Sequence, residues 1–89
     1  MTTVAVPYSI DDSIYGFKFS VEGVKILKAY GGAAEKSSFT ISSAGNIVIA
    51  YNLHGSSISP GTGVLLNLDI EGIESDCVIS NFIILDKAL

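Results

Sequence analysis

Hydrophobic and polar residues alternate with a period of two along most of the chain. The alternation is clearest in segment 15–21, whose apolar side carries Tyr15, Phe17, Phe19 and Val21. A half-buried β-strand shows this period, because successive side chains point to opposite faces of a sheet. The segment is therefore predicted to be a strand with its aromatic side in the core.

Six further segments are predicted to be strands: 4–10, 24–30, 39–42, 46–53, 64–70 and 77–86. Pro7 indicates that the first of them lies at a sheet edge or bends there, because proline cannot donate a hydrogen bond to a central ladder. In the last segment the polar pair Ser80 and Asn81 interrupts the apolar run. This break predicts a β-bulge near Asn81 or a strand covered on both faces.

The predicted core follows from the phase of each strand. In segment 46–53 the side predicted to face the core carries Ile47, Ile49, Tyr51 and Leu53, and the other side carries Val48 and Ala50. In segment 64–70 the core side is predicted to carry Val64, Leu66, Leu68 and Ile70. The residues expected to be buried together are Phe17, Phe19, Phe39, Ile41, Ile49, Leu66, Leu68 and Ile79. Ile58, in the polar segment 55–63, is expected to enter the core as a plug.

These strands are joined by glycine- and serine-rich connections. Segment 31–38 is predicted to be a loop with room for one helical turn at most, so no substantial helix is expected. About seven short strands with turns between them favour an all-β fold, a small antiparallel β-sandwich of jelly-roll type. A small barrel is the structural alternative. The 89 residues are expected to form a single domain, 1–89.

Composition and charge narrow the possible partners. The chain is 48% hydrophobic and 16% charged, which excludes intrinsic disorder. The net charge of −4 and the lack of a lysine or arginine cluster argue against nucleic acid as a partner. No apolar run approaches the ~18–20 residues needed to cross a bilayer, so membrane insertion is not expected. No secretion signal is visible, and the single Cys77 cannot form an intramolecular disulfide.

The residues that could carry chemistry are few. His54 is the only histidine and has no second ligand for zinc, so neither a catalytic site nor a cofactor is predicted. Two acidic groups could hold calcium if their loops met at one end of the sandwich, namely Asp11, Asp12, Glu71, Glu74 and Asp76. Their spacing does not match a local calcium loop, and solvated acidic turns are the simpler interpretation. No metal is therefore predicted.

Tyrosines are the remaining candidates for binding. Tyr15 and Tyr51 fall on the predicted core side of their strands, which leaves Tyr8 and Tyr30 as candidates for an exposed platform. Two or three tyrosines on one sheet face could stack on sugar rings, although the chain has no tryptophan. A possible glycan partner follows from this interpretation.

Three short motifs carry a resemblance to a known family. They are "GFxF" at residues 16–19, "PGxG" at 60–63 before an apolar strand, and "SNxxxxD" at 80–86 in the closing strand. With segments 29–35 and 39–42 they cover most of the chain. The sequence resembles cohesin-like β-sandwich domains. It resembles even more a compact repeat of surface proteins of marine bacteria and of phage-associated proteins.

The resemblance implies a non-enzymatic jelly-roll domain used for adhesion, scaffolding or display, on an extracellular or virion surface. The chain is shorter than complete cohesin domains, and a tight turn at residues 22–24 replaces the usual "YDP" connection. Dockerin binding is therefore not carried over. The function predicted is a non-catalytic structural or interaction module. The alternative is a carbohydrate-binding module that uses exposed tyrosines, with or without calcium.

Self-association is the last expectation. Val48 and Ala50, together with those of residues 82–85 that face away from the core, leave more apolar surface than two layers of this size can cover. The edge segment 4–10 carries no charge and invites pairing. A homo-oligomer formed through a sheet face or an edge is predicted, most simply a two-fold dimer.

Overall fold

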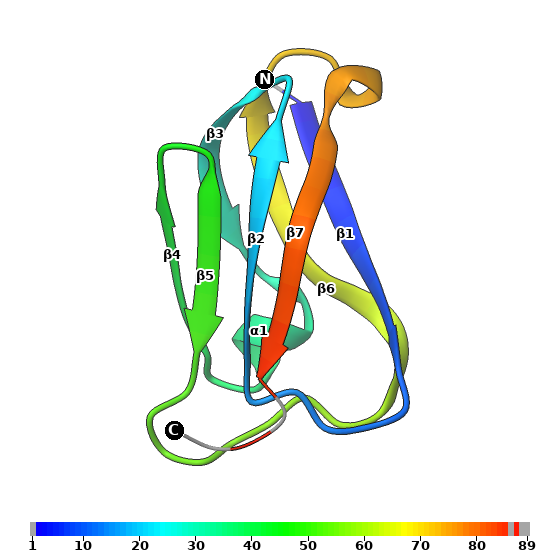
Figure 1. Cartoon of the computed structure of the whole chain (residues 1–89), viewed down its shortest axis with the longest axis vertical. Coiled ribbons are helices and arrows are strands. Elements are labelled where there is room, and N and C mark those ends of the chain that lie inside the picture. The colour runs from blue at the N-terminus through cyan, green and yellow to red at the C-terminus, as the bar shows by residue number, and fades with distance from the viewer. Residues whose placement is uncertain (1, 86, 88–89) are drawn as a thin grey trace.

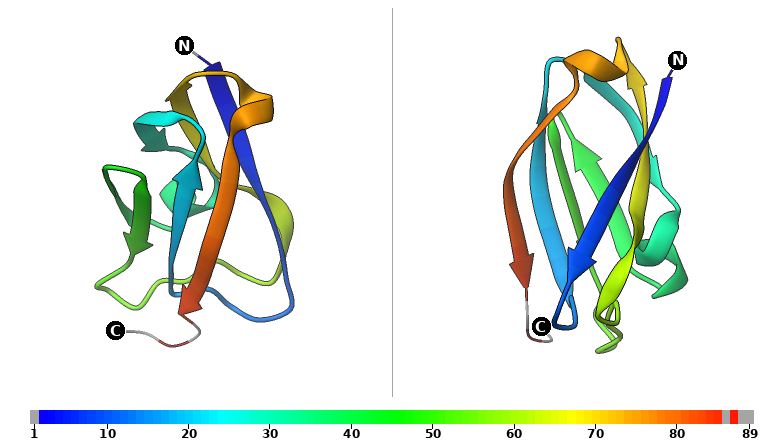
Figure 2. Two further views of the ribbon diagram at one scale, coloured as in Figure 1. Left: turned by 45° about the horizontal axis from the view of Figure 1, so that its top comes forward. Right: turned by 90° about the vertical axis from the view of Figure 1, so that its right-hand side faces the viewer.

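Two antiparallel sheets pack face to face in the computed structural model, which describes residues 2–85 and 87 (Figure 1). The elements are β1 (Thr2–Ile10), β2 (Gly16–Glu22), β3 (Lys25–Tyr30), α1 (Gly32–Lys36), β4 (Thr40–Ala44), β5 (Ile47–Tyr51), β6 (Gly61–Glu71), the 3-10 helix η1 (Glu74–Asp76) and β7 (Val78–Leu85). One sheet has the order β1-β6-β3 and the other β4-β5-β2-β7. Figure 2 shows the two layers edge-on. The predicted all-β fold with seven strands is confirmed for these residues.

Aromatic side chains of the four-stranded sheet fill the space between the layers. Phe17 and Phe19 of β2 are at most 1% exposed, and their rings stack with centroids 6.1 Å apart. Phe82 of β7 stacks on Phe19 with a centroid distance of 5.2 Å. The predicted inward side of β2 is therefore confirmed. The aromatic packing on this side continues onto Phe82 of the neighbouring strand β7.

Most of the predicted core is buried. Phe17, Phe19, Phe39, Leu66 and Leu68 are buried, and Ile41 and Ile79 are partly buried against them. Ile58 is 2% exposed, which confirms the predicted plug. Its backbone is held in place by two hydrogen bonds with Ile14, of 2.8 and 2.9 Å. A polar loop is thus fixed to the core at one apolar residue.

The prediction of which side of β5 faces the core is wrong. Val48 and Ala50 are buried, whereas Ile47 is 36% and Ile49 42% exposed. Directly paired residues of an antiparallel pair point to the same face. Phe19 pairs with Val48, and Phe17 pairs with Ala50. The bulky rings of β2 therefore lie beside small side chains of β5. Because cores have little spare volume, isoleucines in those positions would overfill the layer.

The prediction for β6 needs a similar correction. Val64 is 42% exposed, and Leu65 and Leu66 are both buried. The pairing of β1 with β6 shifts between Val6 and Pro7, and this shift leaves Leu65 as an extra residue. A bulge of this kind changes which side of the strand faces inward. The structure confirms that β1, which carries Pro7, is an edge strand.

The bulge predicted near Asn81 is confirmed. Asn81 has a positive φ of 53°, and the pairing of β2 with β7 shifts between Lys18 and Ser20. Asparagine is one of the few non-glycine residues that tolerate this conformation. Beyond the bulge, β7 continues with Phe82 and Ile84 directed toward the core side, since Ile84 pairs with the buried Phe17.

Helix α1 lies within the segment predicted to be a loop and has five residues. It joins β3 of one sheet to β4 of the other and contacts both β4 and β6. A Cβ atom at Gly32 would lie 2.5 Å from the carbonyl oxygen of Leu65, so only glycine allows this close approach. The helix therefore closes the flank of the sandwich between β3 and β4.

The phase of β5 can be tested with two neighbouring substitutions. Val48→Ala should lower the free energy of unfolding by about 2 kcal/mol, because it removes fully buried methyl groups. Ile49→Ala removes more atoms but should cost less than about 1 kcal/mol, because its side chain faces outward. Urea denaturation of both variants measures the difference. A larger loss for Ile49→Ala than for Val48→Ala would show that the strand is turned the other way.

Candidate functional site

The outer side of the four-stranded sheet carries large apolar side chains. Lys18 of β2 pairs with Ile49 on one side and with Ile83 on the other, so these three residues face outward together. We call the outward-facing group Ile47, Ile49, Tyr51, Ile83 and Leu85 the outer apolar face. Its isoleucines and leucine are between 36% and 54% exposed.

A shallow groove runs across the outer apolar face. Two of its lining residues, Tyr51 and Leu85, pair with Gly16 from either side. A Cβ atom at Gly16 would lie 2.9 Å from Cδ1 of Leu85 and 3.1 Å from the carbonyl oxygen of Ala50, so the missing side chain is what lets Leu85 lie over the strand. The groove has a volume of about 230 Å³ and an almost entirely apolar lining.

Two opposite charges lie on the strand at the middle of this face. Lys18 and Glu22 both point outward from β2, with Ser20 midway between them, because alternate residues of a strand share a face. Oε2 of Glu22 accepts a hydrogen bond of 3.4 Å from the Ser80 hydroxyl. The face is therefore apolar with a positive and a negative group along one strand.

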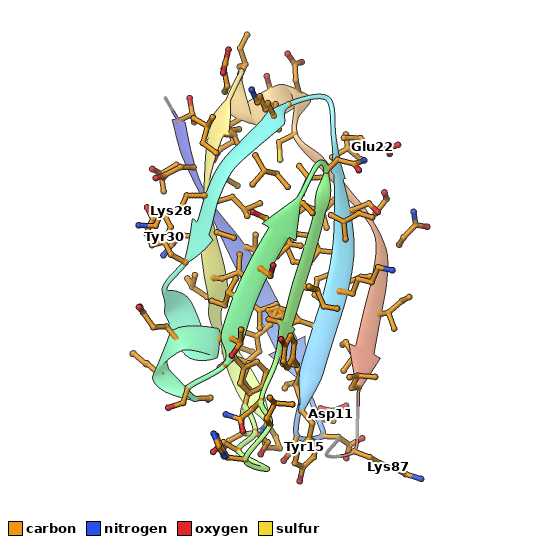
Figure 3. The ribbon with its side chains drawn as sticks, turned by 90° about the vertical axis from the view of Figure 1, so that its left-hand side faces the viewer. Asp11, Tyr15, Glu22, Lys28, Tyr30 and Lys87 are labelled. Carbon is orange, nitrogen blue, oxygen red and sulfur yellow. The ribbon has the colours of Figure 1, made fainter. Side chains whose placement is uncertain are left out.

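The outer side of the three-stranded sheet is polar instead. Oδ1 of Asp69 accepts hydrogen bonds from the Thr3 hydroxyl at 2.7 Å and from the Tyr30 hydroxyl at 3.0 Å. Nζ of Lys28 lies 5.1 Å from the centre of the Tyr30 ring, and Figure 3 shows the two side chains together. Tyr30 is thus part of a network with its neighbours on the sheet.

The two tyrosines that were candidates for a sugar-binding platform do not share a face. Tyr30 lies on the outer side of the three-stranded sheet, whereas Tyr8 lines a hollow between β1 and β7. Tyr15 and Tyr51, which were expected in the core, are both half-buried. Tyr51 faces outward beside Gly16 and belongs to the outer apolar face. The structure therefore assembles no platform from Tyr8 and Tyr30.

The two acidic groups lie at opposite ends of the sandwich. Asp11 and Asp12 follow β1, and Figure 3 shows Asp11 at the end far from Glu22. Glu71, Glu74 and Asp76 surround the connection from β6 to β7, and the eleven-residue β6 separates this connection from the other end. Within residues 2–85 and 87, no three potential metal ligands gather in one place. The two loops that would have to meet to form a calcium site are therefore not brought together.

Asn52 is a structural residue that the sequence analysis missed. Its side chain is 3% exposed, and its Nδ2 donates to the backbone oxygens of Ser37 and Ser38 at 3.1 and 2.9 Å. Its Oδ1 accepts from the backbone N–H groups of His54 and Ser56 at 2.7 and 3.2 Å. One amide therefore ties the loop before β4 to the loop after β5. The side chain of His54 is exposed on this loop.

Cys77 is partly buried against the core just before β7. Burial raises the pKa of its thiol, and the nearby carboxylate of Glu74 raises it further. A raised pKa leaves less of the reactive thiolate at neutral pH. A partly buried thiol of low reactivity is typical of a small packing residue.

Comparison with known proteins found no matching family model, no similar curated protein and no similar solved structure. The cohesin-like resemblance thus stays a prediction from the sequence motifs. Among the described residues, no helix has the length and apolar character to cross a membrane.

The role of Asn52 predicts a specific loss of stability. Asn52→Ala removes the partners of four backbone groups and should lower the free energy of unfolding by about 1–3 kcal/mol. Asn46→Ala is the matched control, since Asn46 is exposed in a turn and its loss should cost less than about 0.5 kcal/mol. Thermal melts measure both. Equal melting temperatures for the two variants would exclude the anchoring role.

The raised pKa of Cys77 predicts slow reaction with a disulfide reagent. The rate with Ellman's reagent should be lower than that of free cysteine at pH 7–8, about the range in which an ordinary thiol begins to ionise. It should go on rising at pH values where free cysteine has levelled off. Glu74→Gln should move the midpoint to lower pH, because it removes a negative charge near the thiolate. A rate at pH 7 above that of free cysteine would contradict the assignment.

Proposed function

We propose that the protein is a non-catalytic structural module that associates with a second copy of itself through the outer apolar face. The observation that carries the proposal is the exposure of Ile47, Ile49 and Ile83 on one side of a small acidic domain. Contiguous apolar patches of this kind mark interaction surfaces in soluble proteins. The proposal agrees with the scaffolding or display role that the sequence resemblance implies.

The charges on β2 favour a second copy as the partner. If two copies pack face to face with their strands antiparallel and the two-fold axis near Ser20, Lys18 of each copy faces Glu22 of the other. Each of these residues is two positions, or about 6.6 Å, from Ser20. A two-fold axis parallel to the strands would instead bring Lys18 against Lys18. Electrostatic complementarity therefore selects the antiparallel arrangement.

Apolar side chains match in the same arrangement. Ile83 is level with Lys18 and Val78 is level with Glu22, because each pair is in register on adjacent strands. Ile83 of one copy then faces Val78 of the other, and both are more than half exposed in the single chain. Ile47 is level with Ser20 and lies close to its own copy across the axis. Ile47 and Ile83 of both copies are thus covered by one symmetric contact, whereas Tyr51 and Leu85, which are level with Gly16, lie at its ends.

The size of the face indicates weak association. Four strands about 4.8 Å apart and seven residues at about 3.3 Å each give a face of roughly 19 by 23 Å, or ~440 Å² in projection. This lies below the ~800 Å² per partner of a standard stable interface. The dimer should therefore form at high protein concentration and dissociate on dilution. The carbohydrate alternative has less support, because Tyr8 and Tyr30 do not share a face.

A charge-reversal experiment tests the arrangement. Lys18→Glu and Glu22→Lys should each be monomeric, because each places like charges opposite one another in the proposed dimer. An equimolar mixture of the two variants should form a dimer, because both cross-copy pairs become attractive again. Sedimentation equilibrium over a range of concentrations measures the masses against 9.3 kDa for one chain.

The wild-type chain and a control variant complete the experiment. Wild type should approach twice the single-chain mass at high concentration. Lys25→Glu reverses a charge on the other sheet and should associate as wild type does. A wild-type mass that stays at one chain would overturn the proposal. A mixture that stays monomeric while wild type dimerises would overturn the antiparallel arrangement.

A further inference from the structure

The sheet edges of the sandwich differ in how they are protected against pairing. Edge strand β3 carries Lys25 and Lys28, β1 carries Pro7 and pairs with β6 across a bulge at Leu65, and β4 is short and mostly polar. Lysines, prolines, bulges and shortness are the devices that keep edge strands from pairing. Residues 78–85 of β7 contain no charged residue and no proline. Edge strand β7 is thus interrupted by the bulge at Asn81 and is otherwise open.

The flank beside β7 is open as well. Phe82 and Ile84 point toward the core side of the sheet, yet they are 40% and 44% exposed. The opposite flank is closed by α1 and by contacts between β3 and β4. The right-hand view of Figure 2 shows β1 and β7 as the strands of the two layers that border this flank. Partly covered core residues therefore lie beside an unpaired strand edge.

A groove follows this flank. A hollow of about 220 Å³ between β1 and β7 is lined by apolar residues that include Leu65, Phe82 and Ile84. It adjoins a wider hollow of about 430 Å³, since Ile10, Ile14 and Ile84 line both. The wider hollow is also lined by Asp11 and Asp12. The flank groove is thus lined by apolar side chains with Ser9 and Ser13 among them, and it is acidic at the end where β7 finishes.

We propose that this flank groove binds an extended segment of another protein, which adds to β7 as a further strand. An extended chain satisfies the free N–H and C=O groups of an edge strand, and its alternate side chains enter the groove. The acidic end selects a segment with a lysine or arginine there. If the added strand runs antiparallel to β7, which is the slightly more stable pairing, its basic residues precede its apolar residues.

The occupant differs from the partner proposed above. The second copy covers the outer side of the four-stranded sheet, whereas the flank groove opens between the two layers. The chain itself has a net charge of −4 and no lysine or arginine cluster, which argues for a segment supplied by a different protein. Charge complementarity with Asp11 and Asp12 therefore points to a basic, apolar-alternating segment.

Fluorescence anisotropy with a labelled synthetic octapeptide tests this site. The probe begins with two lysines and continues with alternating valine and threonine. It should bind the wild-type chain more tightly than the same peptide with the lysines at its C-terminal end. Ile84→Lys should weaken binding by at least about ten-fold, because an inward-pointing lysine blocks the edge and repels the probe. The variant should fold, since Ile84 is 44% exposed, and its melting temperature checks this.

A second variant tests the acidic end. Asp11→Asn with Asp12→Asn should weaken binding of the probe by about two- to five-fold, as expected for exposed charge pairs, and should reduce its salt dependence. Lys18→Glu should bind the probe as wild type does, which separates this result from the test of the dimer. No binding by wild type, or equal binding by wild type and Ile84→Lys, would overturn the proposal. Equal binding of the two peptide orientations would overturn the antiparallel polarity.

Discussion

The structure depends on the aromatic row that joins β2 to β7 between the two sheets. Phe82 stacks on Phe19 at 5.2 Å and on Phe17 at 6.1 Å. Because side chains of a strand alternate, placing Phe82 and Ile84 on the inner side forces Ile83 and Leu85 outward. A strand that is apolar at four successive positions thus contributes side chains both to the inner side of the sheet and to the outer apolar face. Both proposed surfaces include this strand, one through its outer side and the other through its edge.

Much of the fold could be predicted because local signals were clear. Pro7 marked an edge strand, and the polar pair at residues 80–81 marked the bulge in β7. The phase of β5 could not be predicted from its own residues, because both of its sides are apolar. It is decided by the partner strand, where Phe17 and Phe19 need small neighbours. Likewise, the burial of Leu65 follows from a register shift against β1 that no local pattern reveals.

The site was harder to predict than the fold, because its residues meet only through long-range pairing. The prediction that apolar side chains would be left exposed on a sheet face was right. It named Val48 and Ala50 among them, however, and both are buried. The exposed residues are Ile47 and Ile49. They form one apolar face only together with Ile83, which lies on a strand far along the chain. Asn52 lies within the segment predicted to be a strand, and only the approach of the loop before β4 shows it to be an anchor.

The most direct test of the account is the solvent exposure of isoleucine methyl groups, measured by NMR with a soluble paramagnetic agent at low and high protein concentration. At low concentration the methyl groups of Ile47 and Ile83 should be strongly relaxed, whereas those of Ile70 should not be. At high concentration Ile47 and Ile83 should become protected while Ile73, exposed on the connection from β6 to β7, stays relaxed. Protection of Ile47 at every concentration would contradict the phase of β5. Strong relaxation of both Ile47 and Ile83 at high concentration would contradict self-association through the outer apolar face.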